Sequence, residues 1–297
     1  MLKACIVILS SRKRCLFKSL QSLWKFYNYK YNYPVFIYYF DNVYDSWFYQ
    51  RRVHKKISEN IFFKKMDYET PKFLKEEELF YNRKDFWTVR TSFPKKRKGY
   101  LHMCNFFINM YAYPNTDLKN YDFVMTHDDE AGYLKDMKID PFSVIANSKQ
   151  LIGAYSVGQR LIDGKPHQGH LDTRYGLWNF TKEFIVKNKI NPKSIQLKNL
   201  MNDSNAEKNF HYIDWCDSYI INTKIFKMDL WVNWINAVNS NGGVYKYRWG
   251  DNEIYSLFCH MIQEKIICTN TVKDGFHDQG LFRSLQDYAP GVKNPNK

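Results

Sequence analysis

The sequence predicts an α/β fold of the doubly wound kind. Short apolar runs alternate with segments of helical periodicity along the first part of the chain. A later apolar run ends directly in acidic residues, as strands do at the ligand-binding edge of open α/β sheets. The 297 residues are 44% hydrophobic and 18% aromatic, a composition that excludes a largely disordered chain.

The N-terminal segment supplies the first strands and helices. Ala4–Leu9 is a continuous apolar run, as expected of a central strand that is buried on both faces. Apolar residues at helical spacing predict a helix after the first strand and another after the second. The expected strands are Ala4–Leu9, Pro34–Phe40 and Ile61–Phe63; the helices carry Leu16, Leu20, Leu23 and Trp24 in one case and Trp47, Phe48 and Val53 in the other.

The remainder of the chain is predicted to continue one domain over residues 1–280, with a loosely ordered tail at 281–297. Residues 67–99 lack periodicity and are expected to cross the edge of the sheet. Pro192–Asn209 is polar and is expected to be a mobile loop, and Gly242-Gly243 marks a turn. The expected elements are helices at Leu101–Met110, Phe226–Val238 and Asp251–Met261 and strands at Tyr121–Met125, Leu151–Tyr155 and Ile266–Cys268.

The formal net charge of +14 favours anionic partners. Basic residues cluster at Lys95–Lys98 and at positions 51, 52, 55 and 56, although each cluster also fits an ordinary solvated face. No nucleic-acid-binding motif accompanies them, and the basic residues are spread through the chain, so no specific nucleic-acid partner is expected. A phosphorylated small ligand and a weak association with anionic membranes agree with this charge.

The cysteines and the N-terminus bear on where the protein works. The six cysteines form no C-x-x-C pair, which argues against a structural zinc site and favours buried thiols; a Cys216–Cys259 or Cys259–Cys268 bridge is the alternative. The first apolar run is too short to span a membrane and lacks a cleavage site. We therefore expect a cytoplasmic or peripheral protein without signal peptide or membrane anchor, such as a large DNA virus or a microbe could encode.

An acidic cluster is the first candidate for chemistry. Asp128-Asp129-Glu130 follows the apolar run Tyr121–Met125, which would place three carboxylates at the carboxyl edge of the sheet. Carboxylate oxygens suit Mn²⁺ or Mg²⁺, and such a cation neutralises the pyrophosphate that leaves when a sugar is transferred from a nucleotide. An ordinary acidic turn is the alternative interpretation.

Two downstream segments add candidates. Asp251 follows Trp249-Gly250 and begins a predicted helix, where it either caps the helix or faces an acceptor hydroxyl. His277 and Asp278 follow a short strand and would complete a metal site. His167, His170 and Asp172 could also chelate a metal, but their glycine-bearing context favours a surface loop.

Six segments in the same order resemble glycosyltransferase family 15, the fungal-type α-1,2-mannosyltransferases. Gly242–Asp251 is the most similar and resembles the family's "GGFFYERWGD". Gly99–Phe107 is similar to "SYRHMCRFFSGFF". The other similar segments are Asn32–Phe36, Tyr121–Glu130, Asp214–Cys216 and Asp274–His277.

The resemblance implies a GT-A-like nucleotide-sugar-binding fold, with a single Rossmann-like mixed sheet flanked by helices. It implies retaining transfer of mannose or a related hexose to a glycan, a glycoprotein or another hydroxyl acceptor. The implied cofactors are Mn²⁺ (or Mg²⁺) and GDP-mannose or a UDP-sugar as donor. By this resemblance the metal ligands are Asp128, Glu130 and His277 or Asp278, the donor-binding residues are Asp128, Asp129, Glu130, Tyr100, Arg248 and Trp249, and the catalytic residues are Asp251 and Tyr100. Asp217 is added as a catalytic candidate on its own position in the sequence.

The sequence also departs from the family pattern. Tyr219 occupies the position of the family's candidate nucleophile, a glutamate, and Asp217 lies two residues away. Either Asp217 serves as nucleophile or the reaction proceeds on one face of the sugar without one. The metal motif is Asp-Asp-Glu in place of Glu-Pro-Asp, and the anchor and stem of the fungal enzymes are not seen. A non-catalytic relative that binds sugar or nucleotide-sugar is the alternative function.

Overall fold

The computed structural model describes residues 2–67, 69–80, 82, 98–113, 116–133, 135–158, 161–162, 165–166, 174–209, 215–268 and 275–277. Its centre is a seven-stranded sheet with the order β10-β6-β9-β4-β1-β2-β3. These strands are β1 (Ala4–Leu9), β2 (Val35–Tyr39), β3 (Ile61–Lys65), β4 (Phe123–Thr126), β6 (Ile152–Gly158), β9 (Trp215–Asn222) and β10 (Ile267–Cys268). Two further pairs join β5 (Ala131–Tyr133) to β11 (Gly275–His277) and β7 (Leu161–Ile162) to β8 (Lys165–Pro166).

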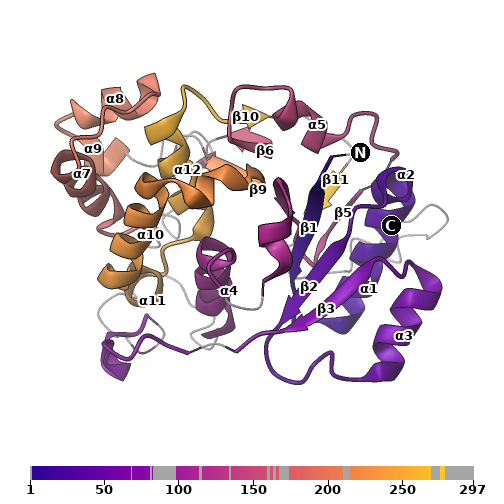
Figure 1. The fold of residues 1–297 in the computed structure, drawn as a ribbon. Coiled ribbons are helices and arrows are strands. Elements are labelled where there is room, and N and C mark those ends of the chain that lie inside the picture. The colour runs from indigo at the N-terminus through magenta and orange to yellow at the C-terminus, as the bar shows by residue number, and fades with distance from the viewer. Residues whose placement is uncertain are drawn as a thin grey trace.

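Helices cover both faces of the sheet, and Figure 1 shows those of the N-terminal segment on one side and those of the C-terminal half on the other. The former are α1 (Lys13–Leu23), extended by a π-helical turn at Trp24–Asn28, α2 (Tyr29–Tyr31) and α3 (Trp47–Lys56). α5 (Pro141–Ala146) lies with them, because its Phe142 and Ile145 belong to the same core. The others are α4 (Lys98–Asn109), α7 (Leu177–Lys187), α8 (Ile195–Met201), α9 (Ala206–Asn209), α10 (Asp229–Asn241), α11 (Gly243–Tyr247) and α12 (Asp251–Ile262).

The strand directions bring the functional segments to one edge of the sheet. Neighbouring strands are parallel except at β9, which is antiparallel to both β4 and β6. Met125 of β4 pairs with Ile220 of β9, so Tyr219 and Asp217 lie where β4 ends. The carboxyl ends of β1 and β4 and the amino end of β9 therefore meet at the same edge.

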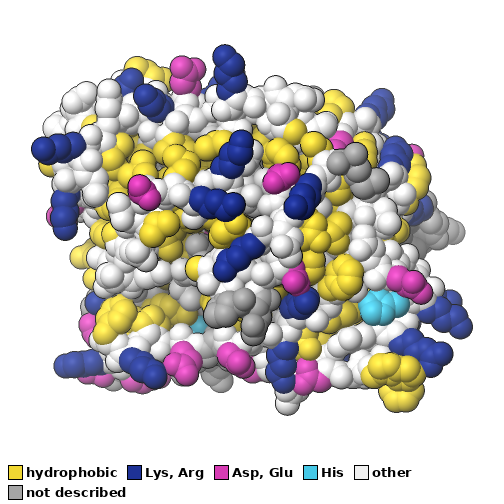
Figure 2. All heavy atoms as spheres, in the orientation of Figure 1, with side chains coloured by type: hydrophobic (Ala, Val, Ile, Leu, Met, Phe, Trp, Pro, Cys, Tyr) yellow, Lys and Arg dark blue, Asp and Glu magenta, His cyan; other side chains and the backbone are white. Residues whose placement is uncertain are grey.

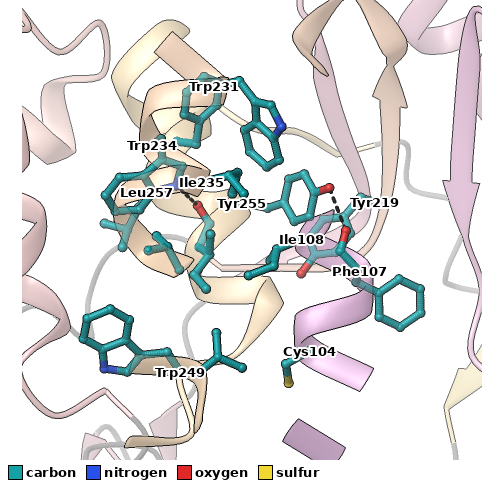
Figure 3. Packing of buried hydrophobic residues seen from close by; sticks show 14 of the residues in the cluster. Cys104, Phe107, Ile108, Tyr219, Trp231, Trp234, Ile235, Trp249, Tyr255 and Leu257 are labelled. Atoms are coloured by element: carbon teal, nitrogen blue, oxygen red, sulfur yellow. Dashed lines mark hydrogen bonds between the residues drawn. The ribbon is translucent and has the colours of Figure 1, made fainter. Parts of the chain in front are cut away.

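Alternate residues of the central strands belong to two hydrophobic cores, one on each face of the sheet. Ile6 and Ile8 of β1 lie in the core under α1 and α3, while Cys5 and Val7 lie in the core of the C-terminal helices. Figure 3 shows this second core, in which the Tyr255 hydroxyl on α12 donates to the Phe107 carbonyl on α4 at 3.0 Å. The core thus ties together the two helices that flank the end of β9.

Most predicted elements are found, with one wrong prediction and several omissions, of which β9 and α7 are the longest. Pro192–Asn209 is not a loop, because α8 and α9 lie within it. Ser194 caps α8 by accepting a hydrogen bond from the Leu197 amide at 3.1 Å, and Leu197 is fully buried, while polar residues cover the outer face and hide the helical pattern. Strand β9 and helix α7 were not predicted.

The remaining predictions fall partly outside the described residues. Gly242 ends α10 with a φ of 75°, in agreement with the predicted turn. Cys5 and Cys104 are buried free thiols, as predicted, whereas the free thiol of Cys15 is partly exposed. Residues 83–97, the segment with His167, His170 and Asp172, and the tail at 281–297 are not among the described residues. None of the helices in the described ranges has the length and apolar content to cross a bilayer.

Candidate active site

The acidic cluster lies in the short connection between β4 and β5. The His127 amide donates to the Val7 carbonyl of β1 at 2.9 Å, which holds the start of this connection against the neighbouring strand. Asp129 and Glu130 are buried, and Asp128 is partly exposed. The sequence places this cluster correctly, because a buried strand must end where its apolar run ends.

Arg12 binds two of the three carboxylates. It follows β1 and forms ion pairs with both Asp129 and Glu130, while about half of its own side chain (46%) stays exposed. The Ser10 hydroxyl donates to Asp129 at 2.5 Å. Burial raises the pKa of Asp129, and the charge of Arg12 opposes that increase.

Ser10 and Arg12 were not predicted as site residues. They follow β1, whose carboxyl end lies beside that of β4, so the rule that identified the acidic cluster would also have identified them. The exposed guanidinium also supplies a fixed positive charge next to the carboxylates.

Asp251 faces the acidic loop from the start of α12. It is buried with 7% of its surface exposed, and it accepts hydrogen bonds from the Cys104 thiol and, at 3.3 Å, from the Tyr219 hydroxyl. Burial, followed by the negative charges of Asp128 and Glu253, raises the pKa of Asp251 to about 7. The shift shows that Asp128 and Asp251, which are far apart in the sequence, lie close enough to repel one another.

Tyr219 fills the position at which the family resemblance predicts a glutamate. Its side chain is buried, its amide donates to the Thr126 hydroxyl at 2.8 Å, and its ring lies 4.6 Å from that of Tyr255 between centroids. Its hydroxyl also contacts the Asn252 amide oxygen. Tyr219 therefore links β9 to the first turn of α12, which is a structural role.

Tyr100 and Arg248 lie together beside Asp251. The guanidinium of Arg248 lies 4.1 Å from the centroid of the Tyr100 ring, and Arg248 has a φ of 61°. The neighbouring Cys104 sulfur and burial raise the pKa of Tyr100, which keeps its hydroxyl protonated at neutral pH. A left-handed backbone at a non-glycine residue is held at an energetic cost, so the position of Arg248 is strongly constrained.

Trp249, the other predicted donor-binding residue of this segment, is buried with 1% of its surface exposed. Its indole N–H donates to the Tyr175 carbonyl at 2.8 Å, and its ring packs against Phe180 at 5.1 Å between centroids. A β-carbon at Gly243 would lie 2.2 Å from the Trp249 ring, which explains the glycine there. These contacts favour a structural role for Trp249, and its donor-binding role stays a prediction.

The predicted metal ligands are only partly described. The backbone of His277 on β11 pairs with Ala131 on β5, next to Glu130, so the two predicted segments are neighbours. The His277 side chain and all of Asp278 lie outside the described residues. Within the described part of the chain, no three His, Cys, Asp or Glu side chains are grouped closely enough to hold a metal ion.

The chemistry of the described residues nevertheless suits a divalent cation. Asp128 and Glu130 offer the oxygen ligands that Mn²⁺ and Mg²⁺ prefer. After burial, the negative charge of Asp128 is the next cause of the raised pKa of Asp251, and a cation beside Asp128 would reduce that repulsion. The backbone of Asp217, the candidate nucleophile, lies on β9 two residues from Tyr219 and pairs with Ser156 on β6.

A cleft of about 500 Å³ lies along α4 and α10, away from these carboxylates. Its lining includes Phe73, Asn105, Asn109, Tyr113 and Asn239, and none of the acidic residues of the loop after β4. The amides of Asn109 and Asn239 bond each other at 2.8 Å and 3.2 Å. The candidate site is the acidic loop after β4, because it lies at the carboxyl edge of the sheet, where open α/β folds bind their ligands.

Replacing Asp251 with asparagine is expected to stabilise the protein at high pH. Because the folded state raises the pKa of Asp251, the free energy of unfolding falls as the pH rises from about 4 to about 7. Asp251→Asn removes that dependence and should raise the free energy of unfolding by about 4 kcal/mol at pH 8 and little at pH 4. Urea unfolding in the presence of EDTA measures the free energy of unfolding at both pH values, and Asp229→Asn, at an exposed position, is the control. Equal effects of Asp251→Asn at pH 4 and pH 8 would contradict a raised pKa of Asp251.

Comparison with known proteins identifies relatives over nearly the whole chain. The model of the family described as "Glycolipid 2-alpha-mannosyltransferase" matches residues 2–279. The probable mannosyltransferase MNT3 of Candida albicans is 27% identical over 198 residues, which is 66% of this chain and 48% of that protein. The probable mannosyltransferase KTR3 of Saccharomyces cerevisiae is 26% identical over 56% of this chain and 39% of its own length. The chain thus spans half the length or less of these relatives.

Solved structures share the fold. Ktr4p from S. cerevisiae in complex with GDP superposes with a TM-score of 0.70 at 17% identity, covering 89% of this chain and 67% of that one. Core-mannan synthase A from Aspergillus fumigatus, in a Mn/GDP form, gives a TM-score of 0.71 at 17% identity, covering 88% and 70%. The predicted GT-A-like α/β fold is therefore confirmed.

Proposed function

The chain belongs to the glycolipid 2-alpha-mannosyltransferase family, and we propose that it transfers mannose or a related hexose from a nucleotide-sugar to a hydroxyl of a glycan or glycoprotein. One observation carries this proposal. The partly exposed carboxylate of Asp128, at the carboxyl edge of the sheet, lies close enough to the buried Asp251 to raise its pKa, and Arg12 holds the adjacent carboxylates.

The proposed donor is GDP-mannose, with a UDP-sugar as the alternative. The structural relatives bound to GDP, one of them also to manganese, support this choice. The proposed metal ligands are Asp128, Glu130 and His277 or Asp278, and the metal is Mn²⁺ or Mg²⁺. When bound, the cation supplies positive charge that stabilises the departing diphosphate. The half-exposed guanidinium of Arg12 is placed to bind the same anionic group.

The remaining residues would bind and orient the two substrates. The protonated hydroxyl of Tyr100 can donate a hydrogen bond to the donor sugar, and Arg248 holds its ring. Asp251 is partly protonated near neutral pH and can exchange hydrogen bonds with the acceptor hydroxyl. The hydrogen bond from Tyr219 fixes the orientation of that carboxylate.

We propose that the reaction retains configuration on the front face of the sugar. The bond from the anomeric carbon to the phosphate oxygen breaks, the acceptor oxygen bonds to the same carbon, and the acceptor proton passes to the departing phosphate. The protein then contributes orientation and charge stabilisation. The contacts of Tyr219 support this route, because they place a buried phenol where a double displacement would need a carboxylate.

Asp217→Asn tests the mechanism. The front-face route predicts a loss of turnover of about tenfold or less, because Asp217 then affects only orientation. A double displacement through Asp217 predicts a loss of several orders of magnitude, since an amide cannot form the covalent intermediate. Single-turnover kinetics measures the loss. Trapping of a hexose on Asp217 in a mass spectrum would contradict the front-face route.

The function itself is tested by a screen of GDP- and UDP-sugars for nucleotide release, with and without Mn²⁺. We expect release from one donor that requires the metal and increases with a glycan acceptor. Binding of a nucleotide-sugar without release, under every acceptor and metal condition, would instead support the non-catalytic alternative.

A further inference from the structure

The outer face of α3 carries two parallel rows of side chains. In each row an aromatic residue, an arginine and a lysine follow at intervals of four residues, which places them on one side of a helix. All six side chains are exposed, and within the helix only Val53 is buried. The rows are Trp47, Arg51 and Lys55, and Phe48, Arg52 and Lys56.

The two aromatic rings project from the start of this helix. Phe48 is 78% exposed and Trp47 is 58% exposed, and their ring centroids are 5.2 Å apart. Arg51 lies over the Trp47 ring at 4.8 Å. Figure 2 shows hydrophobic side chains at the lower right corner, where Figure 1 places α3, with Lys and Arg side chains directly beside them. Single exposed aromatics are common on protein surfaces, whereas an adjacent, protruding pair indicates a contact surface.

The positive charge of this face is not neutralised by any carboxylate in the described part of the chain. No carboxylate among the described residues forms an ion pair with Arg51, Arg52, Lys55 or Lys56. Lys13 of α1 adds a further cation, with its amino group 5.7 Å from the centroid of the Tyr49 ring on α3. The surface therefore attracts an anionic partner.

We propose that this face of α3 docks on an anionic lipid membrane, with the rings of Trp47 and Phe48 in the interface and the four cations against lipid headgroups. Exposed aromatics beside Lys and Arg are the combination that holds peripheral helices at a membrane surface. A second copy of the chain is a poorer partner, because two such faces would bring like charges together. The rings protrude from a convex helix, whereas single-stranded nucleic acid stacks its bases within grooves.

The segment that leads into α3 reaches the acidic loop from the interior of the protein. Tyr44 lies three residues before α3, and its hydroxyl is 2.6 Å from that of Ser10, which in turn donates to Asp129 at 2.5 Å. Docking through α3 would therefore engage a helix whose preceding segment contacts the acidic loop.

Vesicle co-sedimentation with the whole chain tests the proposal. Binding is expected to phosphatidylcholine vesicles that contain about 30% phosphatidylserine, and not to pure phosphatidylcholine. Arg51→Gln with Lys55→Gln should weaken binding about fivefold for each cation removed. Trp47→Ala with Phe48→Ala should weaken it about tenfold or more, because the rings no longer enter the interface. Quenching of tryptophan fluorescence by brominated lipid should fall in Trp47→Phe, a variant that still binds.

Matched controls separate this surface from general properties of a basic protein. Phe73 is 56% exposed elsewhere, and Lys182 and Lys187 are exposed on α7, so Phe73→Ala and Lys182→Gln with Lys187→Gln should bind as the wild type does. Equal loss in these controls, absence of vesicle binding, or binding that ignores lipid charge would overturn the proposal. If the protein forms a dimer that is lost in Trp47→Ala with Phe48→Ala, the partner of this face is a second copy of the chain and the proposal is wrong. If the protein binds single-stranded RNA more tightly than vesicles, the partner is nucleic acid and the proposal is also wrong.

Discussion

Asp128→Ala is expected to reduce metal-dependent nucleotide release by about a thousandfold or more. Asp128 is the exposed member of the acidic cluster, and its loss removes both a proposed metal ligand and the negative charge that attracts the cation. Donor binding should lose its dependence on Mn²⁺ as well. Turnover and isothermal titration with and without the metal measure the two effects.

The fold of this variant should be unchanged, because a partly exposed loop carboxylate contributes little to stability. The variant should also lower the pKa of Asp251, since the charge of Asp128 is one cause of its increase. The pH at which the free energy of unfolding declines would then shift downward, a readout that does not require activity. Asp136→Ala, at an exposed site beyond β5, is the control. Turnover like that of the wild type in Asp128→Ala would show that another residue holds the metal.

The parallel strands could be predicted because each is marked by a continuous apolar run within its own residues. β1, β2 and β4 are buried on both faces, so their apolar runs are continuous and end where the strands end. β9 was missed because its segment mixes polar and apolar residues, and it becomes a strand only by pairing with β4 and β6, which are distant in sequence. In helix α8 only Leu197 and Leu200 are buried, so its apolar pattern is weak. Helix α7 buries Leu177, Trp178, Phe184 and Ile185 at helical spacing, so its local pattern was sufficient to predict it.

The sequence identified some candidate site residues, but not how they are arranged. The strand-end rule identified Asp128, and the family resemblance identified Asp251 and Tyr100. That Asp128 raises the pKa of Asp251, and that Arg12 binds Asp129 and Glu130, depends on strand order. Strand order is set by packing over the whole chain, so it cannot be predicted from any short segment of the sequence.

A buried ion pair supports the helix that carries Asp251. Arg174 and Glu253 are both almost fully buried, with the guanidinium 3.3 Å from the carboxylate. Glu253 lies in the first turn of α12, and its charge is also one of the causes that raise the pKa of Asp251. Loss of the arginine would therefore leave two carboxylates close together with less positive charge between them.

Arg174→Met is expected to lower the free energy of unfolding by about 3–5 kcal/mol, because it leaves the charge of Glu253 buried without this partner. Adding Glu253→Gln should recover part of the loss, since the double variant no longer buries that charge. Urea unfolding of the two single variants and the double variant measures the coupling. Lys65→Met is the matched control: it breaks an ion pair of 2.8 Å with Asp45 whose two side chains are more than 40% exposed, and it should cost under about 1 kcal/mol. A loss in Arg174→Met no larger than in this control, or no recovery in the double variant, would show that the pair is not what holds the start of α12 in place.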